Sequence, residues 1–148
     1  VYTDVVQEVL DELRDRMEAM ISAGVTPDQI VLDPGLGFSK RPEQAHNWAL
    51  LHDLERFHEL NRPVLVAGSR KRSLSRLLSD PDTEERPFTE CDAATAAVTT
   101  LAADRGAWAV RVHDVGPNAD AVRVAATWSD GGARLDRGRF TSEGRGVR

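Results

Sequence analysis

The sequence reads RPVLVAGSRKRSLSRLL from residue 62 to residue 78, an apolar segment followed at once by a basic one. Val64–Ala67 has the length and composition of a short buried strand. Gly68 interrupts this pattern, and the residues after it favour a helix that ends near Ser79. The predicted apolar face of that helix consists of Leu74, Leu77 and Leu78. The segment therefore predicts a strand that turns directly into a helix.

Three cations, Arg70, Lys71 and Arg72, stand at the predicted start of this helix. A helix start already carries about half a positive charge and has N–H groups without intrahelical partners. Each added cation there costs about 0.3–1 kcal/mol of helix stability. A solvated basic turn is the ordinary explanation of such a run. We instead expect the turn to receive an anion.

The composition is that of one globular unit. The chain has 148 residues, 41% of them hydrophobic, a net charge of −5 and a single cysteine, Cys91. The acidic balance argues against a nucleic-acid groove, and one cysteine excludes a disulfide within the chain and leaves a cysteine-based metal site unsupported. Cys91 is expected to be a small, partly buried residue. No apolar run reaches the ~20 residues of a membrane span and no signal peptide is visible, so we expect a cytoplasmic protein without membrane contact. The chain begins with Val1, inside a predicted helix, which suggests a fragment.

Helices alternate with short apolar strands in the first half of the chain. A helical pattern runs to about Ala23, and Ile30–Leu32 follows as a buried strand. That strand stops at the glycine-rich loop Asp33–Phe38. A second helix is predicted from Glu43 to Leu60. Its apolar face would carry Trp48, Leu51, Leu54 and Phe57.

The alternation continues in the second half. Asp92 is expected to cap an alanine-rich helix that packs closely against a sheet and closes at Gly106. Strand Ala107–Val112 comes next, and Pro117-Asn118 opens the last helix, Ala119–Trp128. Its candidate apolar contacts are Val122, Val124 and Trp128. We assign residues 1–130 to the folded domain and residues 131–148, which are rich in glycine and arginine, to a disordered tail.

This order predicts an α/β protein with parallel strands, and in such folds ligands bind beyond the carboxyl ends of the strands. All three predicted strands place polar residues there. Asp33 closes the first, Ser69-Arg70-Lys71 the second, and Arg111 and His113 the third. Side chains alternate along a strand, so Arg111 and His113 point to the same face. We expect these residues to converge on one rim.

Three motifs at these positions resemble those of dihydropteroate synthase. They are Asp33-Pro34-Gly35-Leu36-Gly37-Phe38, Ser69-Arg70-Lys71 and Arg111-Val112-His113-Asp114, and His46-Asn47-Trp48 adds to the likeness. The resemblance runs from the first helix to about Trp128 and is greatest to the actinobacterial branch. It implies an α/β fold that forms the C-terminal portion, about strands six to eight with their helices, of a (β/α)8 TIM barrel.

The resemblance also implies an activity in folate synthesis and a set of site residues. The family is a transferase that joins 6-hydroxymethyl-7,8-dihydropterin pyrophosphate to p-aminobenzoate and releases pyrophosphate, and it is the sulfonamide target. Lys71, Arg111 and His113 would be catalytic. The substrate-binding residues would be Asp33, Gly37, Phe38, Ser69, Arg70, Lys71, Arg72, Arg111 and His113.

Further expectations come from the same resemblance. Mg²⁺ would bind through the substrate pyrophosphate and through amino-terminal loops of the family that are absent from this chain; the three motifs imply no metal ligand of their own. The full-length protein would be a homodimer with small-molecule substrates. Because a typical barrel has ~250 residues, we expect this chain by itself to be inactive and prone to aggregate.

The sequence leaves alternatives open. Ser73 and Ser75 depart from the family pattern, which puts the p-aminobenzoate end of the site in question and allows a non-catalytic or altered-substrate paralogue that binds a pterin or an anion. A methyltetrahydrofolate-type pterin-binding methyltransferase would share the strand-end carboxylate. Arg111 and His113 argue against it, because a methyl transfer has no pyrophosphate to receive. A module that serves only in protein interaction is a third, weaker alternative.

Overall fold

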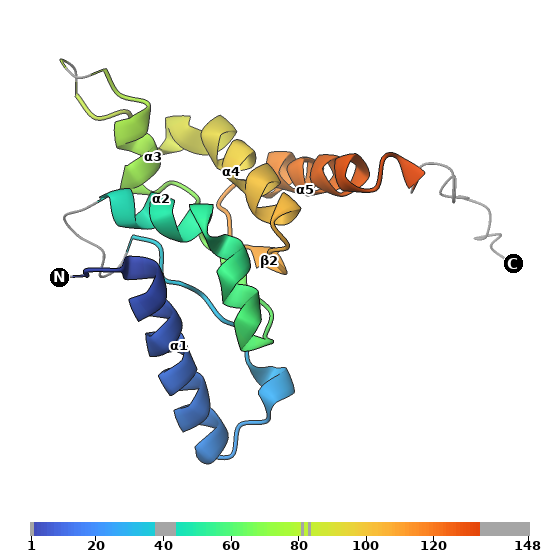
Figure 1. Cartoon of the computed structure of the whole chain (residues 1–148). Helices are drawn as coiled ribbons and strands as arrows, with labels where there is room; N and C mark the ends of the chain where they lie inside the picture. The colour runs from blue at the N-terminus through green and yellow to red at the C-terminus, as the bar shows by residue number, and fades with distance from the viewer. Residues whose placement is uncertain (1, 38–43, 81, 83, 134–148) are drawn as a thin grey trace, which may run out of the picture.

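The computed structural model describes residues 2–37, 44–80, 82 and 84–133 (Figure 1). The expected site residue Phe38 and residues 134–148 of the expected tail lie outside the described residues. Within the described ranges, none of the helices combines the length and the apolar character needed to cross a membrane.

Helix α1, Val5–Ser22, forms as predicted. Asp4 begins it, because its carboxylate accepts a hydrogen bond from the backbone N–H of Gln7 at 3.1 Å. Its buried side chains all come from the first two turns: Val5, Val6, Val9 and Leu10. Gly24 ends the helix with a φ of +97°, and the 3-10 turn η1, Pro27–Gln29, leads toward the first strand.

The second predicted helix is two elements, not one. Helix α2 spans Gln44–His52, and the 3-10 helix η2 continues as Leu54–Leu60. A 3-10 helix has three residues per turn, so Leu54, Phe57 and Leu60 fall on one buried face. The predicted face is therefore wrong in part: Leu50 is buried in α2, whereas Trp48 and Leu51 are only partly buried.

Two short parallel strands form the sheet, and a third segment joins it through one parallel bridge, which agrees with the predicted parallel arrangement. Strand β1, Leu65–Val66, pairs in parallel with β2, Ala109–Val110, in the register Leu65 to Ala109 and Val66 to Val110. On its other side, Val64 forms a parallel bridge with Leu32. Both strands are shorter than the predicted Val64–Ala67 and Ala107–Val112.

Helix α3 is short, and it covers less of the core than predicted. It spans Arg72–Leu77, with Leu74 buried but Leu77 62% exposed. Leu74 lies in the first turn, whereas Leu77 is the last residue of this short helix and extends past the part that contacts the core. The predicted burial of Leu77 is therefore wrong.

Helix α4, Asp92–Asp104, follows the 3-10 turn η3, Phe88–Cys91. Cys91, and not Asp92, occupies the N-cap position, and its thiol is fully buried instead of partly buried. The predicted cap is wrong because the Asp92 carboxylate binds Arg70 instead. Helix α4 ends at Gly106, which has a φ of +80°, as predicted.

Helix α5, Val115–Ser129, begins before the predicted Pro117-Asn118 and packs along α4 (Figure 1). Its buried residues are Asn118, Ala121 and Ala125, spaced for one helical face. The predicted contacts Val122, Val124 and Trp128 are exposed, and Trp128 is 83% exposed. This prediction is wrong because the alanine-rich surface of α4 admits small side chains at close approach, not large ones.

The hydrophobic core lies between α1, the α2–η2 pair and the strands. Its members are all buried hydrophobic residues: Val5, Val6, Val9, Leu10, Ile30, Leu32, Leu36, Leu50, Leu54, Phe57, Leu60, Val64, Val66 and Ala102. Helix α4 also approaches the end of β1 closely, since a Cβ atom placed on Gly68 would lie 3.1 Å from Val98 Cγ1. This confirms that the alanine-rich helix packs against the sheet.

Candidate functional site

The carboxyl ends of the three parallel segments meet at one edge of the sheet, which we call the rim. Asp33 follows Leu32, Ser69-Arg70-Lys71 follows β1, and Arg111 and His113 follow β2. The Arg111 N–H donates to Val66 O at 3.0 Å, so the backbone of β2 is still fixed beside β1 where the site begins. The predicted convergence therefore rests on sheet pairing.

Asp33 and Arg111 are brought together across the rim. Arg111 Nη2 lies 3.7 Å from Asp33 Oδ2, because each residue directly follows a segment of the paired sheet. The other Asp33 oxygen, Oδ1, accepts the N–H of Gly35 at 2.8 Å. Both side chains keep solvent access, with 35% of Asp33 and 61% of Arg111 exposed, so a ligand can still reach them.

Lys71 lies against the glycine-rich loop. A Cβ atom on Gly37 would stand 3.1 Å from Lys71 Cδ and 3.6 Å from Lys71 Nζ, so glycine leaves the room that the lysine occupies. Gly37 also has a φ of +81°, which favours glycine. The side chain of Asn47 holds the loop, because its Oδ1 accepts the Gly37 N–H at 2.9 Å.

The ammonium group of Lys71 is electrostatically disfavoured at this position. Burial lowers its pKa from the usual value of 10.5, and the positive charge of Arg111 lowers it further, while Asp33 acts in the opposite direction. Lys71 is therefore within electrostatic range of both other rim charges. Asp33, Lys71 and Arg111, far apart in sequence, act on one region.

Ser69 and His113 form the other contact between strand ends. Ser69 Oγ lies 2.9 Å from His113 Nδ1, and the same oxygen accepts the backbone N–H of His113 at 3.2 Å. Ser69 is buried and His113 is exposed. The serine of the basic turn thus supports the histidine from the protein side.

Arg70 is bound by a carboxylate of the chain itself. Its Nε and Nη2 donate to the two oxygens of Asp92 at 3.0 and 2.8 Å. This bidentate pair lowers the pKa of Asp92. Sequence reasoning missed Asp92 as a partner because its position before an alanine-rich helix is typical of a cap, and only the packing of α4 shows that it faces Arg70.

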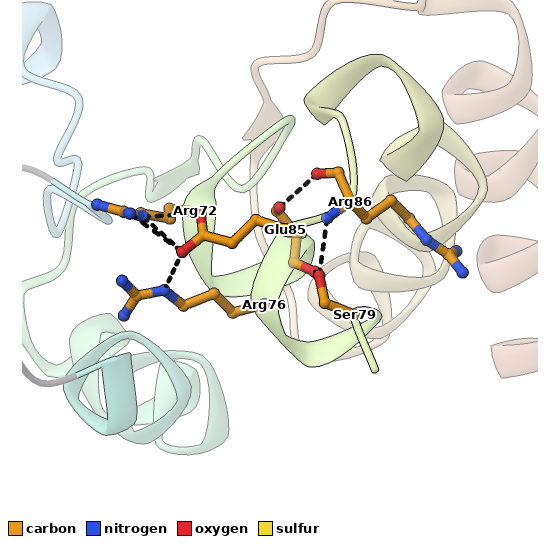
Figure 2. A network of polar contacts seen from close by, with 6 residues as sticks. Arg72, Arg76, Ser79, Glu85 and Arg86 are labelled. Atoms are coloured by element: carbon orange, nitrogen blue, oxygen red, sulfur yellow. Dashed lines mark hydrogen bonds and ion pairs between the residues drawn. The ribbon is translucent and has the colours of Figure 1, made fainter. Parts of the chain in front are cut away.

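Arg72 has a carboxylate partner as well. Figure 2 shows Glu85 between Arg72 and Arg76, with Arg72 Nε 3.0 Å from Glu85 Oε2 and Arg76 Nε 2.6 Å from Glu85 Oε1. The two guanidinium groups lower the pKa of Glu85 to about 2. Part of the positive charge at the start of α3 is therefore balanced internally. No sequence signal distinguished Glu85 from the other acids of its loop.

Two serines bind this loop: Ser75 in α3, and Ser79 just after the helix, which Figure 2 labels. The hydroxyl of Ser75 donates to the carbonyl oxygen of Arg86, and Ser79 Oγ accepts the Arg86 N–H at 2.7 Å. Ser75, which departs from the family pattern, is thus fully buried and has a structural partner. Its hydroxyl helps to place Glu85 beside the arginines.

The described residues offer acceptors and cations, but no metal cluster. Among them, no group of three or more histidine, cysteine or acidic side chains could hold a metal ion. The arrangement can instead accept N–H donors at Asp33 and bind an anion beside Lys71, Arg111 and His113. These are the requirements of a polar heterocycle that carries phosphate.

Comparison with known proteins identifies the family. Residues 1–113 match the family model described as pterin binding enzyme. The chain belongs to the pterin-binding enzyme family. This match covers all three strand-end motifs through His113, and it agrees with the resemblance found in the sequence.

Curated members of the pterin-binding family are similar to the chain over most of its length. The dihydropteroate synthase of Mycobacterium leprae is 44% identical over 138 residues, which are 93% of this chain and 48% of that protein. The dihydropteroate synthase of Streptococcus pyogenes serotype M1 is 44% identical over 124 residues, 84% of this chain and 44% of that one. The chain spans about half the length of these relatives.

Solved structures of pterin-binding enzymes share the fold. Yersinia pestis dihydropteroate synthase in a sulfonamide drug complex superposes with a TM-score of 0.80 at 30% identity, covering 88% of this chain and 45% of that one. The Xanthomonas albilineans dihydropteroate synthase in complex with 7,8-dihydropteroate superposes with a TM-score of 0.77 at 39% identity. The match covers 90% of this chain and 47% of that one. The chain therefore has the fold of part of a TIM-barrel enzyme.

Proposed function

We propose that this chain supplies the pterin and pyrophosphate side of a dihydropteroate synthase, which condenses 6-hydroxymethyl-7,8-dihydropterin pyrophosphate with p-aminobenzoate. The observation that carries the proposal is the 3.7 Å approach of Arg111 to Asp33, with Lys71 within range of both charges. The similarity to dihydropteroate synthases of known structure supports it. By the same reasoning, the three parallel segments correspond to strands six to eight of the barrel.

The pterin ring would be recognised at Asp33 and Lys71. Its aminopyrimidinone edge presents adjacent N–H donors, which a carboxylate accepts in pairs. Lys71 would donate to the ring carbonyl and a ring nitrogen, and its aliphatic part would lie against the ring. On this proposal the ligand N–H groups take over the Asp33 oxygen that faces Arg111, which leaves the guanidinium available for another anion.

The leaving pyrophosphate would bind at Arg111 and His113. Negative charge builds on the leaving group as the C–O bond breaks, so the Arg111 charge and a fixed hydrogen-bond donor on His113 stabilise the transition state more than the ground state. Arg111 could also stack on the ring face. The arylamine then attacks the pterin methylene carbon, and this route needs no protein nucleophile.

The p-aminobenzoate carboxylate would meet the backbone N–H groups of Arg72 and Ser73. Helix α3 has only six residues, so its dipole contributes little and the N–H groups themselves would do the binding. The Arg72 side chain is held by Glu85, which directs its charge toward α3 and the loop. A sulfonamide drug would compete for the same position.

The metal ion and the oligomeric state belong to the complete protein. As the family resemblance implies, Mg²⁺ would bind through the substrate pyrophosphate and through the amino-terminal loops of the family. A cytoplasmic homodimer completes the proposal, with the exposed large side chains of α5 as candidate contacts.

The test is pyrophosphate release from dihydropterin pyrophosphate and p-aminobenzoate, measured on the protein as its gene encodes it. Lys71→Ala and Arg111→Ala are each expected to lower turnover about 10²-fold or more, the magnitude typical for loss of one fixed electrostatic donor. Arg14→Ala is the matched control, since Arg14 is a cation that pairs with Asp11 and Glu59 on the α1 side. Near-normal release by either rim variant would refute the assigned roles.

A non-catalytic paralogue predicts a different result. Such a protein would bind dihydropterin pyrophosphate without releasing pyrophosphate, and Lys71→Ala would weaken binding alone. Calorimetry with the pterin substrate, next to the turnover assay, therefore separates the two functions.

A further inference from the structure

The Ser69 hydroxyl is committed to one neighbour. It is 4% exposed, and both of the hydrogen bonds that the described residues give it involve His113: Oγ accepts the backbone N–H at 3.2 Å and lies 2.9 Å from ring Nδ1. A serine hydroxyl carries one hydrogen and two acceptor lone pairs. One lone pair is occupied by the His113 N–H, so the question is where the hydroxyl hydrogen goes.

Burial answers that question. A buried hydroxyl keeps a hydrogen-bond acceptor, because a buried polar group without a partner is strongly disfavoured. Within the described part of the chain, the acceptor that the structure gives Ser69 is His113 Nδ1. The hydroxyl therefore donates to Nδ1, and a neutral imidazole with Nδ1 as acceptor carries its hydrogen on Nε2.

The backbone next to Ser69 is fixed by a second pair. Arg70 has a φ of +51°, a left-handed conformation that is strained for a residue other than glycine. Its guanidinium binds both oxygens of Asp92 at the start of α4. The ion pair therefore stabilises the strained turn that directly follows Ser69.

We propose that Ser69 is a positioning residue that keeps neutral His113 in the Nε2–H tautomer, with the Arg70–Asp92 pair holding the turn in place. The functional meaning rests on the proposed function above. An Nε2–H group donates a hydrogen bond to an oxygen of the diphosphate, whereas an unprotonated Nε2 would present a lone pair to it. His113 is then a donor to the leaving group even as a neutral ring.

The tautomer is measured by NMR on the gene-encoded protein labelled with 15N-histidine. The ring nitrogens of His113, identified by their loss in His113→Gln, are expected to report the Nε2–H form when the ring is neutral at basic pH. Ser69→Ala should change this to a mixture of tautomers, and Ser69→Thr, which keeps the hydroxyl, should restore it. An Nδ1–H tautomer in the wild type would overturn the proposal.

Thr95→Val is the matched control. Thr95 is also buried, lines the same small cavity as Ser69, and donates its hydroxyl to Cys91 O at 3.0 Å. Removing this hydroxyl should leave the His113 tautomer unchanged. If Ser69→Ala does not fold, the tautomers of the wild type and of Ser69→Thr still test the proposal, because both should be Nε2–H. Asp92→Asn weakens the ion pair with Arg70. It should therefore also move His113 from the Nε2–H form toward a mixture of tautomers.

A titration with inorganic pyrophosphate separates the two proposals. Ser69→Ala is expected to weaken pyrophosphate binding about 10-fold, which corresponds to about 1.4 kcal/mol for one positioned donor, and Ser69→Thr to retain it. A wild-type Nε2–H tautomer without pyrophosphate binding would support the positioning role and contradict the proposed function. Pyrophosphate binding with a tautomer that Ser69→Ala does not change would contradict the positioning role alone.

Discussion

Lys71 lies near two opposite charges, those of Asp33 and Arg111. Its pKa should therefore respond to the removal of either charge. Burial and Arg111 lower its pKa, while Asp33 raises it. Arg111→Gln removes a repelling charge and should raise the Lys71 pKa, whereas Asp33→Asn should lower it. Arg111→Lys, which keeps the charge, is the control and should leave it low. Titration of the 13C-methylated amine by NMR measures these shifts. A Lys71 pKa that falls in Arg111→Gln or rises in Asp33→Asn would show that the residues do not share one site.

Glu85 links the start of α3 to its loop and predicts an acid-sensitive contact. Its pKa is lowered to about 2 from 4.5 by Arg72 and Arg76. A group with a depressed folded-state pKa stabilises the fold above its unfolded pKa and loses this contribution as pH falls. The free energy of unfolding should therefore decrease between about pH 4.5 and pH 2, and Glu85→Gln should flatten this decrease.

Denaturant unfolding at a series of pH values measures the Glu85 effect. The control is Glu90→Gln, which neutralises an exposed carboxylate on η3 outside the pair network. Since exposed ion pairs contribute little, we expect a small change in slope that salt reduces further. The same slope in Glu85→Gln and wild type would show that the arginines do not hold this carboxylate in solution.

At the scale of elements, two helices end on glycines in the same conformation but in different surroundings. Gly24 after α1 has a φ of +97°, and a Cβ atom added to it would meet no atom within 4 Å. Gly106 after α4 has a φ of +80°, and its added Cβ atom would lie 3.0 Å from His58 Nε2. His58 is held there by a 2.9 Å hydrogen bond to Arg105 O. Alanine would therefore strain the backbone at both positions, but it would also cause a steric clash at Gly106.

This difference gives a matched pair of variants. Gly24→Ala should lower the free energy of unfolding by about 1 kcal/mol through backbone strain alone. Gly106→Ala should cost more, because it also displaces His58 from the end of α4. Thermal or denaturant unfolding of both variants measures the difference. Equal losses of unfolding free energy in the two variants would mean that His58 can move aside without destabilising the protein.

The exposed face of α5 is a property of the whole molecule. Helix α5 uses Ala121 and Ala125 against α4 and leaves Val124 and Trp128 outside. If the protein is a homodimer through this face, Trp128→Asp should shift its mass in solution from dimer toward monomer, because a buried carboxylate at an apolar contact is costly. Met20→Asp, an equivalent change at an exposed residue of α1, should leave the mass unchanged. Sedimentation or light scattering gives the answer, and an unchanged mass would remove α5 from the interface.

The sequence by itself determined the order of elements, the parallel pairing and the residues at the strand ends. These follow from local rules, since apolar runs of a few residues make strands and polar residues gather where parallel strands end. Asp33, Lys71, Arg111 and His113 were therefore predictable as a group. The family motifs named the chemistry that this group could serve.

Only the tertiary structure decided which partner each charged side chain has and which helical faces are buried. Asp92 binds Arg70 instead of capping α4, and α5 buries its small residues instead of Trp128. Both outcomes depend on how closely α4 approaches its neighbours. Such distances are set by packing between segments far apart in the chain, and local sequence patterns do not contain them.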